Sequence, residues 1–223
     1  MNVLKEILLK LPPGTVLDAP AKDYVSIDIS SSNKTLDTFD VSSSKEWEKY
    51  INSYVKDHQA KIAYGGYLEV RDIYNRSSHF NNTMDEERNI HLGIDLWTAS
   101  GTAVLAPLEG TVHSFQNNTN YGDYGPTIIL EHSIGKITFY TLYGHLSENS
   151  IATLQKGKQI QKGAIIGYLG DATVNGDYAP HLHFQIILDI ADYKGDYPGV
   201  TSKKELNFYQ GNCPDPNLLL KLS

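Results

Sequence analysis

The chain has 223 residues, of which 40% are hydrophobic and 20% charged, a composition typical of one sizeable folded domain or of one domain with an appendage. Its 19 basic and 26 acidic residues give a net charge of −7, and no Lys/Arg cluster is present, so nothing favours nucleic acid as a partner. A single cysteine, Cys213, excludes an intramolecular disulfide and a zinc site built from thiolates.

The first residues predict a short helix that ends at Pro12 and Pro13. Lys5, Glu6 and Lys10 place charges where a signal peptide has its apolar part, and no small-residue cleavage site follows. We therefore expect a cytoplasmic protein without membrane insertion, or a protein of the cell envelope if another route exports it.

Residues 14–44 are polar and show little periodicity, apart from an alternating stretch at 24–29 that predicts a short strand. Ser43 and Glu46 form a capping-box pattern, and apolar residues then recur at helical spacing as far as His58. This pattern predicts a helix with His58 on its surface.

Residues 63–74 are rich in aromatic residues and glycine. Arg71 and Tyr74 either face a substrate from this stretch or pack against the core, and we favour packing. The following residues, 75–89, are polar, and we interpret His79 within them as a solvated loop histidine.

Two separated stretches carry residue types that bind metals. His91 and Asp95 lie four positions apart in the first, and His181 and His183 lie two positions apart in the second. Two neutral imidazoles and one carboxylate suit a divalent metal, and they leave a bound Zn²⁺ with net positive charge. Three protein ligands with one open position are the pattern of a catalytic zinc site.

The spacing of these residues restricts their geometry. A fully extended chain would separate the Cα atoms of His91 and Asp95 by roughly 13 Å, so the chain must bend, and Gly93 lies midway where a residue without Cβ allows this. In a strand, His181 and His183 share one face about 6.6 Å apart. One can then bind the metal while the other stands beside it; spacing does not decide which, and we take His183 as the ligand and His181 as a catalytic imidazole.

Between the two stretches, the pattern predicts a series of short β-strands. They are expected within residues 101–115, broken at Pro107 and Gly110, at 126–132 and 137–145 joined by the turn 133–136, and within 156–170, which echoes 101–112 as a half-repeat. His145 is expected to share one face with Phe139, Thr141 and Tyr143 at the end of a rigid strand, which suits a general base. We interpret His113 and His132 as packing residues.

Four motifs together resemble the lysostaphin/LytM-type zinc endopeptidases, which are peptidoglycan DD-metalloendopeptidases. They occur in the same order and with similar gaps over roughly residues 88 to 190. The motifs are His91-x-x-x-Asp95, the stretch 140–147 ending in Tyr-Gly-His-Leu-Ser, the glycine-punctuated run 156–170, and Pro-His-Leu-His-Phe at 180–184.

The resemblance implies a mainly β fold whose antiparallel sheet core is of the duplicated-hybrid-motif, barrel-sandwich-like type. With the short helices expected near the N-terminus, it divides the chain into three parts. These are a helical or irregular extension at 1–60, the peptidase domain at 61–200, and a tail packed on the domain at 201–223.

The resemblance also implies one Zn²⁺ per chain, held by His91, Asp95 and His183, with His145 and His181 as a catalytic pair. The implied reaction is hydrolysis, by a metal-activated water, of peptide bonds in the cross-links or stem peptides of bacterial cell-wall peptidoglycan.

Small and aromatic residues near the motifs suit a narrow groove for an extended peptide that contains Gly or Ala. The candidate substrate-binding residues are Tyr121, Tyr124 and Tyr178, with Gly65 and Gly66 beside the metal motif.

Three alternatives remain at this point. One is a non-catalytic binding or regulatory module that holds zinc, and another is an intracellular zinc amidase or peptidase that acts on recycled wall fragments or another small amide. A biotinyl- or lipoyl-like carrier domain, suggested by residues 106–112, is disfavoured because no lysine occupies a hairpin tip in the expected setting.

Overall fold

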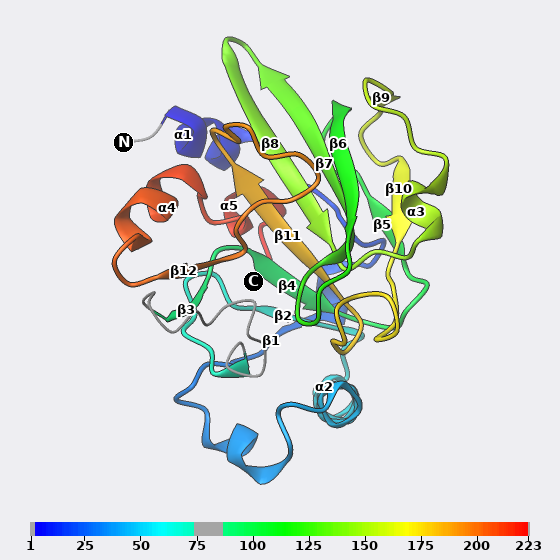
Figure 1. The fold of residues 1–223 in the computed structure, drawn as a ribbon, viewed down its shortest axis with the longest axis vertical. Coiled ribbons are helices and arrows are strands. Elements are labelled where there is room, and N and C mark those ends of the chain that lie inside the picture. The colour runs from blue at the N-terminus through cyan, green and yellow to red at the C-terminus, as the bar shows by residue number, and fades with distance from the viewer. Residues whose placement is uncertain (1–2, 74–86, 223) are drawn as a thin grey trace.

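The protein is organised around one large β-sheet, as the computed structural model shows for residues 3–73 and 87–222 (Figure 1). Among these residues the sheet has eight strands, in the spatial order β1 (Tyr24–Ser26), β2 (Ile62–Gly65), β4 (Ile94–Trp97), β11 (His181–Ile187), β8 (Ile137–Gly144), β7 (Gly125–Ile134), β6 (Gly110–Asn118) and β9 (Gln159–Ile160). Its neighbouring strands run antiparallel apart from β1 and β2, which run parallel. The predicted mainly β fold with an antiparallel core is confirmed.

Two small sheets flank the large one. They pair β5 (Ala103–Leu105) with β10 (Ile165–Tyr168), and β3 (Arg88–His91) with β12 (Val200–Ser202). The pairing of β5 with β10 and of β6 with β9 brings the two glycine-rich stretches of the predicted half-repeat against each other.

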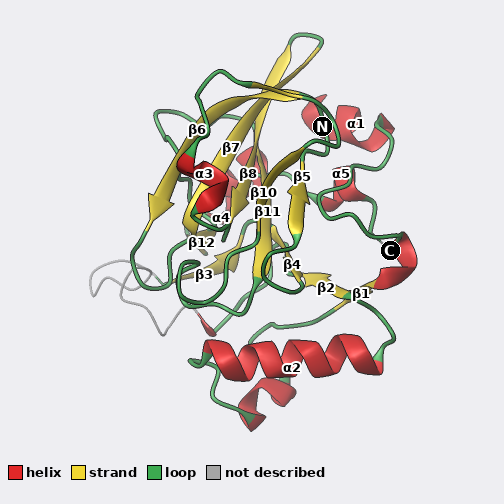
Figure 2. Ribbon diagram, turned by 90° about the vertical axis from the view of Figure 1, so that its right-hand side faces the viewer, coloured by secondary structure: helices red, strands yellow, loops and turns green. Residues whose placement is uncertain are grey.

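The helices cover the sheet from several sides. They are α1 (Val3–Lys10), α2 (Ser44–Asp57), α3 (Asn149–Ala152), α4 (Leu206–Asn212) and α5 (Asn217–Leu220), with 3₁₀ turns η1 (Ala21–Asp23) and η2 (Lys34–Thr38). Figure 2 shows α2 lying across the end of the molecule near β1 and β2, and α1 close to α5. The predicted start of α2 is confirmed, because the Ser43 side chain accepts a hydrogen bond from the Glu46 backbone N–H.

Strand β11 separates the main core from the opposite face of the sheet. Leu182, Phe184 and Ile186 lie in the main hydrophobic core, whereas His181 and His183 alternate with them and point the other way. The predicted alternation is therefore confirmed, and it places both histidines outside the main core although they are buried.

The hairpin of β7 and β8 is present as predicted, but the expected position of His145 is wrong. Phe139 and Tyr143 face the main core, and Gly144, the last residue of β8, pairs with His183 of β11. His145 follows the strand with φ +63°, a left-handed backbone conformation. This turn breaks the alternation and directs the imidazole toward the face that carries His183.

The segment before residue 60 contributes to the same sheet. Strand β1 pairs with β2, and α2 packs Trp47 and Ile51 into a cluster that also contains Trp97 and Ala179. The division of the chain at residues 60 and 200 stays a prediction.

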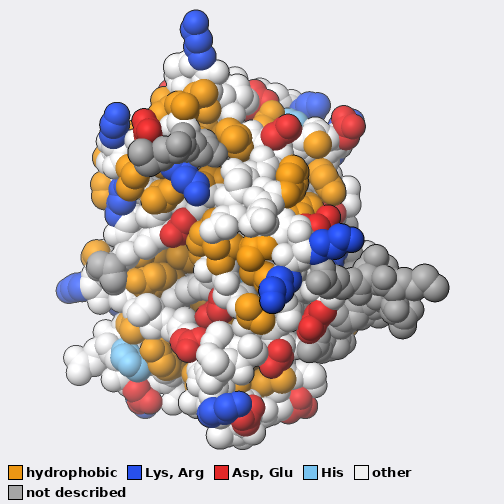
Figure 3. Space-filling model, turned by 90° about the vertical axis from the view of Figure 1, so that its left-hand side faces the viewer, with side chains coloured by type: hydrophobic (Ala, Val, Ile, Leu, Met, Phe, Trp, Pro, Cys, Tyr) orange, Lys and Arg blue, Asp and Glu red, His pale blue; other side chains and the backbone are white. Residues whose placement is uncertain are grey.

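On the face drawn in Figure 3, Lys and Arg side chains are interspersed with Asp and Glu rather than gathered into a basic patch. Within the described ranges 3–73 and 87–222, no helix has both the length and the apolar character needed to cross a bilayer.

Candidate active site

Three side chains from two separated stretches of the sequence meet at one end of β4. His91 ends β3, Asp95 lies in β4, and His183 lies in β11 directly opposite Asp95. One ligand atom from each lies within 4.8 Å of the others, and all three residues are buried. His91 Nε2 is 2.9 Å from His183 Nδ1, and Asp95 Oδ1 is 3.3 Å from the first nitrogen and 3.1 Å from the second.

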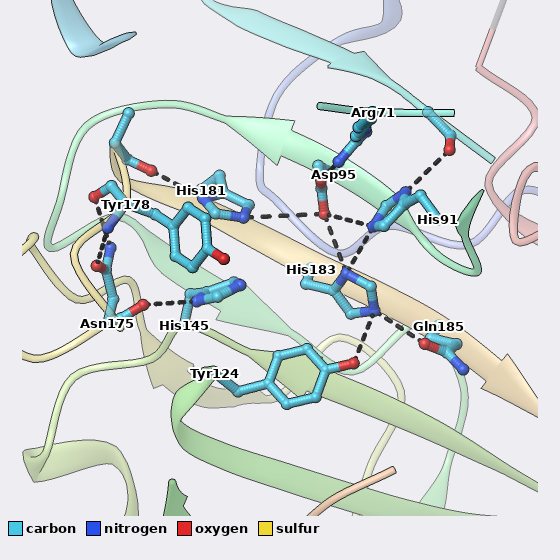
Figure 4. A network of polar contacts seen from close by, with 12 residues as sticks. Arg71, His91, Asp95, Tyr124, His145, Asn175, Tyr178, His181, His183 and Gln185 are labelled. Carbon is cyan, nitrogen blue, oxygen red and sulfur yellow. Dashed lines mark hydrogen bonds and ion pairs between the residues drawn. The ribbon is translucent and has the colours of Figure 1, made fainter. Parts of the chain in front are cut away.

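Hydrogen bonds on the far side of each ring determine which nitrogen faces this point. His91 Nδ1 lies 2.9 Å from the Gly66 carbonyl oxygen, so it is the donor and Nε2 keeps its lone pair. His183 Nε2 lies 2.9 Å from Gln185 Oε1, which leaves the lone pair on Nδ1 (Figure 4). Two lone pairs and a carboxylate oxygen therefore converge, and a divalent cation satisfies all three. This donor set fits Zn²⁺.

Gly93 permits the close approach of the strands that carry the three side chains. A Cβ atom at Gly93 would lie 2.6 Å from Cε1 and 2.7 Å from Nε2 of His183. The His183 ring thus occupies the space that any other residue at position 93 would need. The bend expected between His91 and Asp95 is present, as the break between β3 and β4.

The electrostatics keep Asp95 and His91 in metal-binding protonation states. Burial alone would raise the pKa of Asp95, but its electrostatic interactions with His91 and Arg71 hold it well below the usual carboxyl range. Burial and the positive charge of Arg71 lower the pKa of His91 to about 3. At neutral pH the carboxylate is therefore ionised and the His91 ring is neutral.

A second pair of imidazoles lies beside the three ligand candidates. His145 Nδ1 lies 2.8 Å from the Asn175 carbonyl oxygen and His181 Nδ1 lies 2.8 Å from that of Ala179, so each ring keeps its Nε2 lone pair. The two ring centroids are 4.2 Å apart. Burial, together with the nearby histidines, holds the pKa of His145 well below its usual value, and burial also lowers the pKa of His181. Both rings are neutral near pH 7 and can accept a proton.

Residues 89–194, which carry all five of these side chains, match the sequence profile of peptidase family M23. The chain contains a peptidase family M23 domain.

Three similar proteins show how far the similarity in sequence and structure extends. An uncharacterized metalloprotease of Haemophilus influenzae is 32% identical over 95 residues, which are 43% of this chain and 18% of that protein. The catalytic domain of lysostaphin from Staphylococcus simulans is 20% identical, with a TM-score of 0.40 over 74% of this chain and 96% of that one. A zinc-containing peptidase from Vibrio cholerae is 25% identical, with a TM-score of 0.36 over 48% of this chain and 30% of that one. The match thus spans less than a fifth of the Haemophilus protein.

A short loop before β11 holds the His145 imidazole. The Asn175 side chain donates to the Tyr178 carbonyl and accepts from the Tyr178 N–H, while the Asn175 carbonyl receives the His145 ring. The Tyr178 hydroxyl donates to the Gly122 carbonyl, and its ring contacts the His145 ring edge-to-face with centroids 5.1 Å apart. Asn175 was not identified from the sequence, because nothing in the local pattern shows that its carbonyl faces a histidine 30 residues away.

The metal ligand candidates lie in a pocket with aromatic walls. Tyr124 and Tyr178 line it, as the sequence led us to expect, whereas Tyr121 is 50% exposed and is not among the lining residues. Parts of the chain outside the M23 match also contribute: Ile29 and Trp47 come from the N-terminal segment, and other lining residues come from positions 196–200.

Several other sequence interpretations have a definite outcome. Arg71 is buried, as expected for a packing residue, but it also lines the pocket, which was the alternative that we did not favour. Its hydrogen bond to Asp95 could not be foreseen from the sequence. His132 is buried in the hairpin, and His58 is exposed at the end of α2. Tyr74 and His79 lie outside the described residues.

Proposed function

We propose that the M23 domain is a zinc-dependent peptidase that hydrolyses peptide bonds in the cross-links or stem peptides of peptidoglycan. The observation that carries this proposal is the convergence of His91 Nε2, Asp95 Oδ1 and His183 Nδ1 within 4.8 Å, beside two further neutral imidazoles. The peptidoglycan substrate is supported by the sequence motifs alone.

A zinc ion held by His91, Asp95 and His183 would supply Lewis acidity to the scissile carbonyl and would lower the pKa of a water molecule toward about 7. The two imidazoles contribute one neutral ligand each, and the carboxylate contributes the single negative charge. The net charge of such a site is +1, which favours the negative charge that develops on the carbonyl oxygen during hydrolysis.

His145 and His181 are suited to proton transfer. Their Nδ1–H groups are held by backbone carbonyls, so both rings have a fixed orientation and one available acceptor, Nε2. Either ring can take a proton from the attacking water and return it to the leaving amine. His181 Nε2 lies 3.9 Å from Asp95 Oδ1, and this carboxylate stabilises the ring when it becomes charged.

The pocket favours an extended peptide with small side chains. Tyr124 and Tyr178 are each less than a tenth exposed, and their rings pack against His183 and His145. They narrow the space next to the ligand candidates, so residues such as Gly and Ala fit best at the cleaved bond.

Incubation of the purified zinc-loaded protein with defined peptidoglycan fragments and with Gly- and Ala-containing peptides tests the proposal. Mass spectrometry should identify cleaved peptide bonds, and the products should disappear after chelation of the metal and return when zinc is restored. The matched control is His145→Ala, which removes a proton acceptor and leaves the three metal ligands in place. If the zinc-loaded protein leaves every fragment and peptide intact, the proposed function fails.

The compartment in which the protein acts, cytoplasm or cell envelope, stays a prediction. Fractionation of the native cells followed by immunodetection would decide between a peptidase of the wall and one that acts on internal fragments.

A further inference from the structure

Arg71 forms a chain of charged contacts that ends on the carboxylate of the metal site. Its guanidinium is almost completely buried; Nη1 donates to Asp95 Oδ2 at 2.6 Å and Nε donates to Glu69 Oε2 at 2.7 Å. The other Glu69 oxygen, Oε1, accepts the backbone N–H of Ile29 at 3.1 Å. The chain therefore runs from the N-terminal segment to the metal site without an exposed member.

The backbone of this segment is fixed to the strand that carries His91. The Leu68 N–H donates to the His91 carbonyl, the His91 N–H donates to the Glu69 carbonyl, and the Arg71 N–H donates to the Asn89 carbonyl. In such an extended ladder, residues two apart point to the same side. Glu69 and Arg71 are therefore held side by side, at a constant distance from β3.

Gly66 makes room for the guanidinium. A Cβ atom at this position would lie 1.7 Å from Arg71 Nη2, and Gly66 has φ +102°, which other residues rarely adopt. The Gly66 carbonyl also receives the His91 ring. One glycine thus admits Arg71 and orients a metal ligand.

The two oxygens of Asp95 have different surroundings. Oδ1 lies 3.3 Å from His91 Nε2 and 3.1 Å from His183 Nδ1, whereas Oδ2 receives Arg71 Nη1. A carboxylate whose second oxygen is occupied by a charged donor presents a single oxygen to a metal.

We propose that Arg71, held in place by Glu69, is a positioning residue that makes Asp95 a one-oxygen ligand and so keeps a coordination place open. The inference rests on the proposed zinc site. Glu69 and Arg71 lie outside residues 89–194, so a part of the chain beyond the M23 match determines the geometry of the metal ligand.

An arginine is required because the planar guanidinium donates in two directions at once. Nε reaches Glu69 while Nη1 reaches Asp95. A lysine carries the same charge but has a single compact ammonium on a flexible stem, so it cannot reproduce this fork. The charge alone would therefore not hold the carboxylate in one orientation.

Three variants test the inference: Arg71→Lys, Arg71→Met and Glu69→Gln. Zinc affinity is measured by competition with a chromophoric chelator, and coordination by the visible absorption spectrum of the Co²⁺-substituted protein. Both Arg71 variants should bind zinc ~10–100-fold more weakly, the cost usual for loss of a partner that orients a ligand. Their Co²⁺ bands should weaken and shift as Asp95 binds through both oxygens, and Glu69→Gln should show the same changes to a smaller extent.

The matched control is Lys61→Met, which removes the cation of another carboxylate pair, Lys61 Nζ to Asp23 Oδ2 at 2.6 Å, that touches no ligand candidate. This control should bind zinc like the unsubstituted protein. Should Arg71→Met not fold, Arg71→Lys and Glu69→Gln carry the test, because both keep a buried polar group of similar size. Unchanged zinc affinity and an unchanged Co²⁺ spectrum in the variants that fold would overturn the inference.

The outcome is independent of the proposed reaction. If the Arg71 variants lose zinc affinity but the unsubstituted protein cleaves no peptide, the proposed function fails and the positioning role stands. If the peptide is cleaved and the variants bind zinc normally, the positioning role fails instead.

Discussion

In the part of the chain that the structure describes, histidines are buried in two regions, and these regions differ in the surroundings of the second ring nitrogen. In the candidate metal site, three rings hydrogen-bond a backbone carbonyl oxygen through Nδ1, those of His91, His145 and His181. The fourth ring, His183, hydrogen-bonds the Gln185 side chain through Nε2. The remaining nitrogen of each ring is directed into one small space (Figure 4). These four rings are oriented but keep an available lone pair.

In the β7–β8 hairpin, His132 has both nitrogens occupied. Nδ1 lies 2.6 Å from the Glu109 carbonyl oxygen and Nε2 lies 2.7 Å from the Thr141 hydroxyl, while the ring stacks on Phe139. His132 is 2% exposed and His91 is 1% exposed. Burial therefore does not distinguish the histidines of the candidate site from the hairpin histidine; the direction of the second ring nitrogen does.

The largest expected effect comes from removal of a ligand candidate. His183→Ala should abolish zinc binding at micromolar metal, since even the loss of an outer partner costs ~10–100-fold in metal affinity. Equilibrium dialysis with metal analysis of the retained protein measures this. Retention of one zinc per chain would show that the metal binds elsewhere, and the distinction between the site histidines and His132 would then fail.

Substitution of His145, which lies beside the three ligand candidates, should separate catalysis from metal binding. His145→Ala should lower kcat by ~10²–10⁴-fold, the range expected for loss of a general base, while zinc remains bound. Steady-state hydrolysis of a cleavable peptide, with metal content determined on the same sample, gives both values. Parallel loss of zinc and activity would show that His145 acts as a ligand.

The hairpin histidine should behave in the opposite way. His132→Leu should lower the free energy of unfolding by about 1–3 kcal/mol, because the Glu109 carbonyl and the Thr141 hydroxyl lose a buried partner. Urea unfolding measures the change, and peptide hydrolysis by the folded variant should keep its kcat and zinc content. A fall in kcat without a fall in stability would contradict the structural role assigned to His132.

The smallest expected effect is a pH dependence of stability. Burial lowers the pKa of His132 in the folded protein, so below about pH 6.5 the unfolded chain binds more protons at this position. The stabilisation is fully present above that pH and is lost as the pH falls, with a slope of at most ~1.4 kcal/mol per pH unit. The difference in unfolding free energy between the zinc-free protein and zinc-free His132→Leu should therefore shrink from pH 7.5 to pH 5. A constant difference would show that His132 titrates equally in both states.

The sequence predicted the strands well because their alternation reports which face is buried. The pattern around Leu182 and Phe184 correctly placed His181 and His183 on the opposite face of β11. The same rule failed at His145, because a single residue with positive φ after the end of β8 reverses the side to which the imidazole points. Sequence periodicity carries no information on such a reversal.

The residues themselves determined the chemistry that this protein can carry: two imidazoles and a carboxylate for a metal, two more imidazoles for protons, and a glycine where one ring must pass. Only the tertiary structure decided how these groups are held. The Gly66 carbonyl, the Asn175 carbonyl and Arg71 reach the site from segments far away in the chain. The reason is physical: spacing along a strand restricts which side chains share a face, whereas the partner of a ring nitrogen or a carboxylate oxygen depends on which distant backbone the fold brings within 3 Å of it.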